Sequence, residues 1–371
     1  MITYSHPKRK TKVVFVQLGS PKAPTPRALR AYLKDFLGDP RVIDLNPWVW
    51  KIILYCFILP FRPRKSAKLY ARIWDGENFP LITNTKKFTE KVGRELAEID
   101  PEGYVELNYG FLLSPPFVRD IYDSWEQDLR KGVGATKLLV VPMFPQYSES
   151  TVASGIDALA SEISRRVKIP TFEVITNFHR THAFVDSSVQ HIDQTIATLR
   201  AEGKNIDFLL ISFHGMQKRR ILEKGDDYYR HCFETYKMIV TRCKSINAQD
   251  TMMSFQSRFG SEEWITPYTE NIVEDLIRSG RKNIAVYAPS FVVDCLETTD
   301  EIGHELAESA EEWGGKIHPI TCLNSGSDWC KSFAKYIFTQ CEGSAQDKED
   351  LEYSLSDQEY QEIPTLVKNE S

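Results

Sequence analysis

Short apolar runs alternate along the chain with longer stretches in which apolar residues recur at helical spacing. Four such runs are Lys12–Leu18, Lys137–Pro142, Asp207–Phe213 and Asn283–Val293. Continuous apolar runs of this length are typical of parallel strands that are buried on both faces. Helical patterns lie between them, for example at Ser187–Glu202 and Tyr268–Ser279. The alternation predicts an α/β fold with helices on both faces of parallel sheets.

The two halves of the chain share one local pattern, and 371 residues are enough for two domains. In each half a strand is followed by proline, phenylalanine and a polar helix start: KLLVVPMFPQYSEST and NIAVYAPSFVVDCLETTDE. Open α/β domains bind ligands beyond the carboxyl ends of their strands, so two lobes predict a ligand cleft. We expect an N-terminal lobe over residues 1–175, a C-terminal lobe over 176–341 and a tail over 342–371.

The charge is uneven. Net charge is −5 for the whole chain, but residues 342–371 hold nine acidic residues and two lysines. With few apolar residues, this acidic tail is predicted to be disordered. An overall negative charge gives no indication of a nucleic-acid partner, and the chain has no glycine-rich dinucleotide or nucleotide motif.

Carboxylates recur on the helix predicted after Val293. Glu297, Glu301, Glu305 and Glu308 lie at helical spacing, and Asp294 with Glu297 has the pattern of a capping box. The ordinary interpretation is a solvated face of an amphipathic helix. His214 changes the picture, because it also directly follows a buried strand, where α/β lobes present functional groups. An imidazole and carboxylates at strand ends are suited to bind Fe²⁺ or to move protons.

Other polar residues are interpreted as structural. His179 and His182 form an i, i+3 pair without further ligands at suitable spacing. Ser148, Ser150 and Thr151 lie at a predicted helix start, where capping is favoured over binding of an acidic substrate group.

The segment from Trp48 to Leu59 is nearly all apolar and is followed by four basic residues up to Lys68. It is too short to span a membrane. Two interpretations remain open: a buried core helix, or an interfacial segment that makes peripheral contact with an anionic membrane. The apolar run near the N-terminus is too short for a signal peptide.

Seven cysteines are scattered without a CxxC pair, which favours a reducing, cytoplasmic location over a disulfide framework. The spacing of Cys322, Cys330 and Cys341 matches no strong cluster pattern, so no iron–sulfur cluster is expected.

Taken together, several stretches resemble the ferrochelatases, which insert Fe²⁺ into a porphyrin to make haem. The resemblance runs from Lys12 to Ile337. It rests on QLGSP, PQYSEST, SFHG, KGDDYYRHCFET, SFQSRFGSEEWITPYTE and SFVVDCLETTDEI, in that order. It implies two Rossmann-like lobes of the chelatase fold with a porphyrin cleft between them, Fe²⁺ as substrate, no tightly bound cofactor, and a monomer or homodimer.

The resemblance also implies roles for particular residues. His214 and Glu297 would be catalytic and would contact the metal, with Asp294, Glu301 and Glu305 as a path for protons or metal. The residues expected near the porphyrin are Leu18, Tyr109, Tyr147, Tyr228 and Trp264. Residues 48–61 would form the apolar lip through which porphyrin enters.

Some positions depart from the family pattern. Asn108 stands where relatives have arginine, Glu77 and Asn78 replace Gly-Ser, and Cys295 replaces a common histidine. Leu18 favours protoporphyrin IX, since tyrosine stands there in the coproporphyrin branch. The alternatives are a coproporphyrin III ferrochelatase, a porphyrin- or haem-binding homologue without activity, and a chelatase for cobalt or nickel.

Overall fold

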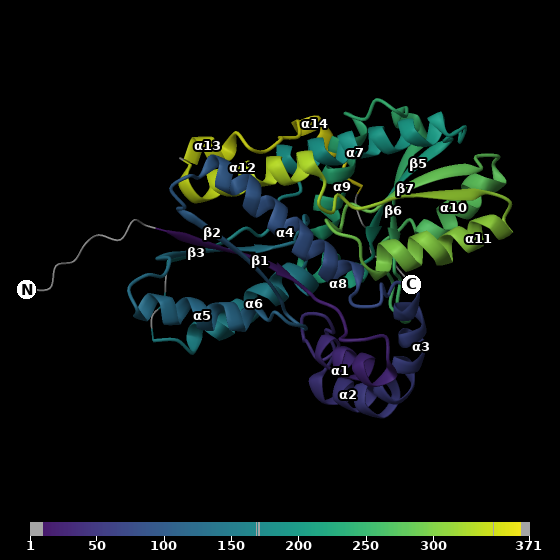
Figure 1. The fold of residues 1–371 in the computed structure, drawn as a ribbon. Coiled ribbons are helices and arrows are strands. Elements are labelled where there is room, and N and C mark those ends of the chain that lie inside the picture. The colour runs from purple at the N-terminus through teal and green to yellow at the C-terminus, as the bar shows by residue number, and fades with distance from the viewer. Residues whose placement is uncertain (1–9, 168, 170, 344, 365–371) are drawn as a thin grey trace, which may run out of the picture. The chain divides into compact units, whose positions relative to one another are not determined.

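The computed structural model describes residues 10–364 except 168, 170 and 344. The chain forms two compact units. The first takes in the described residues among Met1–Phe144, Glu149–Asn177 and Ser325–Glu349; the second takes in those among Pro145–Ser148, Phe178–Asn324 and Asp350–Ser371 (Figure 1). The N-terminal lobe predicted to end at residue 175 therefore also includes the described residues among 325–349, of which 325–341 had been expected in the C-terminal lobe and 342–349 in the tail.

The first unit is built on a parallel sheet of order β2-β1-β3-β4. Its strands are β1 (Thr11–Gln17), β2 (Val105–Phe111), β3 (Lys137–Pro142) and β4 (Thr171–Val174). Its helices are α1 (Pro26–Phe36), α2 (Pro47–Ile53), η1 (Leu54–Ile58), α3 (Leu59–Arg72), α4 (Pro80–Ile99), α5 (Val118–Arg130), η2 (Glu149–Ala153), α6 (Ser154–Ser164), α12 (Ser327–Glu342) and α13 (Ala345–Glu349). Helix α12 joins this unit because Trp329 stacks on Phe88 of α4 and Phe333 contacts Phe15 of β1.

The second unit repeats the same arrangement with strand order β6-β5-β7-β8, again parallel. Its strands are β5 (Phe208–His214), β6 (Thr251–Gln256), β7 (Asn283–Tyr287) and β8 (Lys316–Ile320). Its helices are α7 (His182–Ala201), α8 (Lys218–Lys224), α9 (Tyr228–Val240), η3 (Ala248–Asp250), α10 (Thr269–Arg278), η4 (Glu297–Leu306), α11 (Ala307–Glu312) and α14 (Asp357–Gln361). The predicted α/β class and the parallel sheets are confirmed.

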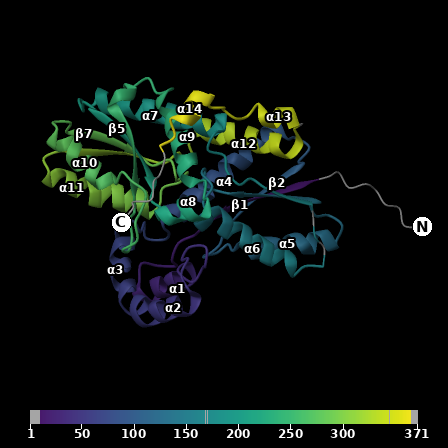
Figure 2. The same cartoon turned by 180° about the vertical axis from the view of Figure 1, so that it is seen from behind.

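Both faces of the second sheet are buried, as the apolar runs predicted. Along β5, Leu209, Ile211 and Phe213 join one apolar cluster, whereas Phe208 and Leu210 join another. Helices α7 and α9 contribute to the first cluster and α10 and α11 to the second (Figure 2). Because side chains alternate across a strand, His214, the last residue of β5, takes the same face of the sheet as Phe208 and Leu210.

The apolar segment after Asn46 is largely exposed, so its interpretation as a buried core helix is wrong. Relative exposure is 77% for Trp48, 62% for Ile52, 63% for Phe57 and 72% for Phe61. Leu54 and Leu59 anchor it in a small core with α1. Among the described residues, no helix has the length and apolar character needed to cross a membrane.

Much of the acidic tail that was predicted to be disordered makes specific contacts in the structure. Glu352 pairs with Arg180 at 2.8 Å, and Arg242 lies 3.8 Å from the ring centre of Tyr353. Ser356 caps α14 with a capping box, and Ile363 packs against the core of the second unit. A few apolar and aromatic side chains are therefore enough to order this acidic stretch. Residues 365–371 lie outside the described residues.

Candidate active site

His214 is the last residue of β5, at the carboxyl edge of the second sheet. Its backbone N–H donates to Ser290 Oγ at 3.1 Å, and its carbonyl accepts from the Tyr228 hydroxyl at 2.9 Å. Its Nδ1 lies 2.7 Å from the carbonyl oxygen of Gly215. A carbonyl only accepts, so Nδ1 carries the proton. In the neutral imidazole, Nε2 then has a lone pair available for a proton or a metal.

Gly215 is required beside this histidine. A Cβ there would lie 2.7 Å from the Gln256 carbonyl and 2.9 Å from the Trp264 ring. Trp264 is buried and donates its Nε1–H to the carbonyl of Phe259 at 2.9 Å. The predicted porphyrin residues Trp264 and Tyr228 are thus both buried, and both support the backbone around His214.

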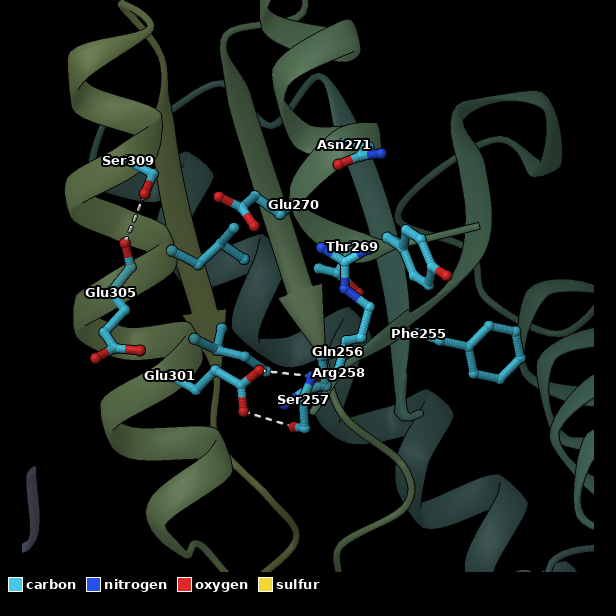
Figure 3. Close-up of a pocket in the computed structure, with 13 residues that line it drawn as sticks. Phe255, Gln256, Ser257, Arg258, Thr269, Glu270, Asn271, Glu301, Glu305 and Ser309 are labelled. Carbon is cyan, nitrogen blue, oxygen red and sulfur yellow. Dashed lines mark hydrogen bonds between the residues drawn. The ribbon is translucent and has the colours of Figure 1, made fainter. Parts of the chain in front are cut away.

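The carboxylates lie on η4, which is a π-helix from Glu297 to Leu306 rather than the predicted α-helix. Such helices are rare and appear mostly at functional sites. Glu301 accepts from the backbone N–H of Ser257 at 2.6 Å and from its hydroxyl at 2.5 Å (Figure 3). Ser257 adopts a positive φ of 64°, which turns both donors toward the carboxylate.

Burial raises the pKa of Glu301, while the Ser257 hydrogen bonds and the charge of His214 act to lower it. The neighbouring carboxylate of Glu297 raises it further. These influences place the three groups in one electrostatic neighbourhood. A carboxyl with a raised pKa is suited to exchange protons closer to neutral pH.

A pocket of about 360 Å³ opens beside Glu301. Its charged lining consists of Glu270, Glu301, Glu305 and Arg258 (Figure 3). Glu305 and Glu308 are exposed. The acidic row therefore runs from the half-buried Glu297 and Glu301 to solvent.

Asp294 has a different environment from the other predicted path residues. Its carboxylate accepts from the Thr298 hydroxyl at 3.1 Å, the Cys322 N–H at 3.0 Å and the Asn324 amide at 2.6 Å. These bonds join the start of η4 to the loop after β8 and replace the expected capping box with Glu297.

The remaining predicted residues are divided between the units. Leu18 and Tyr109 belong to the first unit and are half-buried, whereas Tyr147 belongs to the second. Three positions that differ from the usual ferrochelatase sequence, Asn108, Glu77 and Asn78, also lie in the first unit. The Asn108 amide donates to Glu106 at 3.3 Å, and the backbone N–H groups of Glu77 and Asn78 donate to Asp75.

A second imidazole–carboxylate group was missed from the sequence. His179, His231 and Glu234 are buried, and their ligand atoms lie within 4.8 Å of one another. His179 Nε2 lies 2.6 Å from Glu234 Oε2, and the two imidazole rings stack at 4.1 Å. The i, i+3 spacing of His231 and Glu234 on α9 was a visible signal, but His179 is distant in sequence.

Each unit carries a four-stranded parallel sheet, and the second unit holds an imidazole and carboxylates whose chemistry suits proton transfer or metal binding. The Ferrochelatase family matches residues 10–341. A ferrochelatase of Idiomarina loihiensis is 35% identical over 94% of this chain and 93% of its own length. Another, from Marinobacter nauticus, is 37% identical over 84% of this chain and 82% of its own.

The chain therefore belongs to the ferrochelatase family, enzymes that catalyse metal insertion into porphyrin. The predicted family and enzyme class are confirmed. Among solved structures, SirB from Bacillus subtilis with Fe3+ aligns with 93% of this chain and all of its own at a TM-score of 0.49 and 10% identity.

Proposed function

We propose that this enzyme inserts Fe²⁺ into protoporphyrin IX and releases two protons, the last step of haem formation. The observation that carries the proposal is the contact of His214 Nδ1 with the Gly215 carbonyl at 2.7 Å, which assigns the ring proton to Nδ1. Nε2 is then the reactive nitrogen, in the electrostatic neighbourhood of Glu297 and Glu301.

The two protons come from the two pyrrole N–H groups, which exchange for the iron. His214 Nε2 accepts a pyrrole proton as general base. Glu301, with its raised pKa, accepts a proton in turn and passes it toward Glu305 and solvent along the acidic pocket. Asp294 holds the start of η4 in place through its three hydrogen bonds.

Fe²⁺ must lose its water ligands before it enters the macrocycle. One imidazole nitrogen and one carboxylate, from His214 and Glu297, suit a borderline divalent ion. Two protein ligands hold the ion weakly enough to release it to four pyrrole nitrogens.

We propose protoporphyrin IX rather than coproporphyrin III because the side chain at residue 18 is apolar. Leu18, Tyr109 and Tyr147 would contact the macrocycle, which has no carboxylates on its vinyl edge. Tyr228 and Trp264 would not contact the macrocycle themselves. They would support the backbone of His214 and Gly215, which they contact.

We propose that the segment 48–68 docks on an anionic membrane. Trp48, Ile52, Phe57 and Phe61 expose apolar side chains, and exposed basic residues follow at Arg64, Lys65 and Lys68. Docking from the cytoplasmic side would give access to a lipid-soluble porphyrin. Sedimentation with vesicles of anionic lipid should pellet the wild type, whereas Trp48→Ser/Phe57→Ser should remain in the supernatant.

No resident cofactor is part of the proposal. Burial raises the pKa of the Cys322 thiol well above its usual value and raises those of Cys330 and Cys341 to about 12. The spacing of these three cysteines also matches no strong cluster pattern.

The proposal is tested by mixing the enzyme with Fe²⁺ and protoporphyrin IX without oxygen and following the loss of porphyrin fluorescence. Rapid loss that disappears in His214→Ala and Glu297→Gln is expected. Faster turnover of coproporphyrin III would overturn the substrate assignment. Porphyrin binding without turnover of either substrate would overturn the activity.

A further inference from the structure

We propose that His231 is a positioning residue that holds the segment Pro145–Ser148, and thereby Tyr147, at the active site. The inference rests on the proposed function, because it takes Tyr147 as a porphyrin contact. It assigns a task to a buried group that metal insertion itself does not use.

The segment is fixed through its backbone and through one buried side chain. The Tyr147 N–H donates to His231 Nδ1 at 3.2 Å. The Gln146 amide donates to the Thr235 hydroxyl at 3.0 Å and to the Pro289 carbonyl at 3.3 Å. The Phe178 N–H donates to the Pro145 carbonyl at 2.9 Å. Three consecutive residues are therefore each held by a partner in the second unit.

These partners lead directly to the catalytic histidine. Pro289 is followed by Ser290, whose hydroxyl accepts the His214 N–H at 3.1 Å and lies 2.9 Å from the Tyr228 hydroxyl. The loop that orients His214 is thus the same loop that Gln146 binds. A shift of the segment would move Tyr147 relative to the reacting nitrogen.

The cluster keeps His231 in the form that this task needs. Burial lowers the pKa of His231 to about 3 and that of His179 well below its usual value, so both rings are neutral. His179 stacks on His231 and donates from Nε2 to Glu234 at 2.6 Å. Glu234 is held in turn by Arg230 at 3.3 Å. The His231 ring is therefore fixed in orientation with an acceptor nitrogen facing the segment.

Two histidines and a glutamate suit Zn²⁺ or Fe²⁺. The hydrogen bond from the Tyr147 N–H to His231 Nδ1 nevertheless argues against a metal centre in the cluster. A neutral imidazole that accepts at Nδ1 carries its proton at Nε2 and has no second lone pair. A metal on either nitrogen of His231 would have to displace a proton or the Tyr147 N–H. Histidine ligands in metal sites instead donate their other nitrogen to an acceptor.

The test compares two substitutions of one residue. His231→Asn places an amide oxygen where Nδ1 stands and keeps the acceptor, whereas His231→Leu has a similar size and no acceptor. Met238→Ala, a buried position on the same helix, is the control for lost stability alone. Porphyrin affinity is measured by fluorescence titration, together with kcat, KM and the melting temperature of each variant.

We expect His231→Leu to weaken porphyrin binding about tenfold, the size of one buried hydrogen bond. His231→Asn should restore affinity, and Met238→Ala should lose melting temperature while it keeps affinity. Equal affinity in His231→Leu and wild type, with wild-type turnover intact, would overturn the positioning role. A wild type that does not metallate porphyrin would instead overturn the proposed function. Stoichiometric Zn²⁺ in a His214→Ala variant, lost on adding His231→Asn, would show that the cluster is a metal site.

Discussion

His214 and His231 lie in the same unit, yet their hydrogen bonds differ in one decisive respect. His214 donates from Nδ1 to a carbonyl and leaves Nε2 with a lone pair. His231 accepts at Nδ1 from a backbone N–H, so its proton lies on Nε2. His214 is half-buried, whereas His179, His231 and Glu234 of the cluster are all buried.

The comparison shows that residue types and short distances do not by themselves identify a reactive or metal-binding histidine. The partner of the second nitrogen decides which nitrogen is available. By this criterion the cluster stabilises and positions the chain, and His214 carries the chemistry.

The largest predicted effect separates the two histidines by turnover. His214→Ala should lower kcat by about 10²–10⁴-fold, the range for loss of a general base. His231→Asn, which keeps the acceptor, should leave kcat close to that of the wild type. Circular dichroism of both variants checks that they fold. A similar loss of kcat in both would remove the distinction between them.

The ordered tail should matter for stability and not for turnover. Ending the chain after Glu349 removes the Tyr353–Arg242 contact and the packing of Ile363. The free energy of unfolding should fall by about 2 kcal/mol, from one cation–π contact and one partly buried apolar side chain. Urea unfolding measures this fall, and kcat at 25 °C should stay unchanged. A large loss of kcat would tie the tail to the site.

Part of this organisation was predictable from the sequence. Continuous apolar runs identified β1, β3, β5 and β7, and the position after a strand identified His214. Strand β2 was missed because polar residues interrupt it, and β4 because it is short and largely exposed. The π-helical form of η4 leaves the i, i+4 pattern of its glutamates unchanged, so spacing alone could not reveal it.

The cluster and the tail contacts were beyond sequence reasoning for another reason. His179 is brought to His231 only by the packing of α9 against the chain entering α7. Tyr353 and Ile363 are too few to predict an ordered segment from composition, although each has a specific partner.

The acid side of the pH–rate profile should report on Glu301, and substitution of Ser257 should move it. Ser257→Ala removes one hydrogen bond to ionised Glu301 and so raises its pKa further. If ionised Glu301 accepts protons, the acid limb of the kcat/KM profile should move to higher pH. Glu301→Gln should abolish that limb. If the acid limb of the kcat/KM profile is at the same pH in Ser257→Ala as in the wild type, the limb belongs to a group other than Glu301.

The raised pKa of Glu301 also has a consequence for stability. Between its unfolded pKa and its higher folded pKa, the folded state binds more protons, so stability falls as pH rises through this window. Glu301→Gln removes this dependence, and its melting temperature relative to wild type should rise with pH. A constant difference across the window would contradict the raised pKa.

The smallest effect is expected from one tail ion pair. Glu352→Gln removes a half-exposed partner of Arg180 and should cost at most about 1 kcal/mol. Urea unfolding beside the truncated chain would show whether the apolar contacts of the tail outweigh its charges.

The most direct test of the central claim is nitrogen NMR of protein labelled only at its 8 histidines, with and without Zn²⁺ as a diamagnetic substitute for Fe²⁺. His214→Asn and His231→Asn variants assign the two rings. We predict a proton on Nδ1 of His214 and on Nε2 of His231. Of these two rings, only His214 should show a shift of its nitrogen signals when Zn²⁺ is added. A proton on Nδ1 of His231, or a Zn²⁺-induced shift of its nitrogens, would contradict the account.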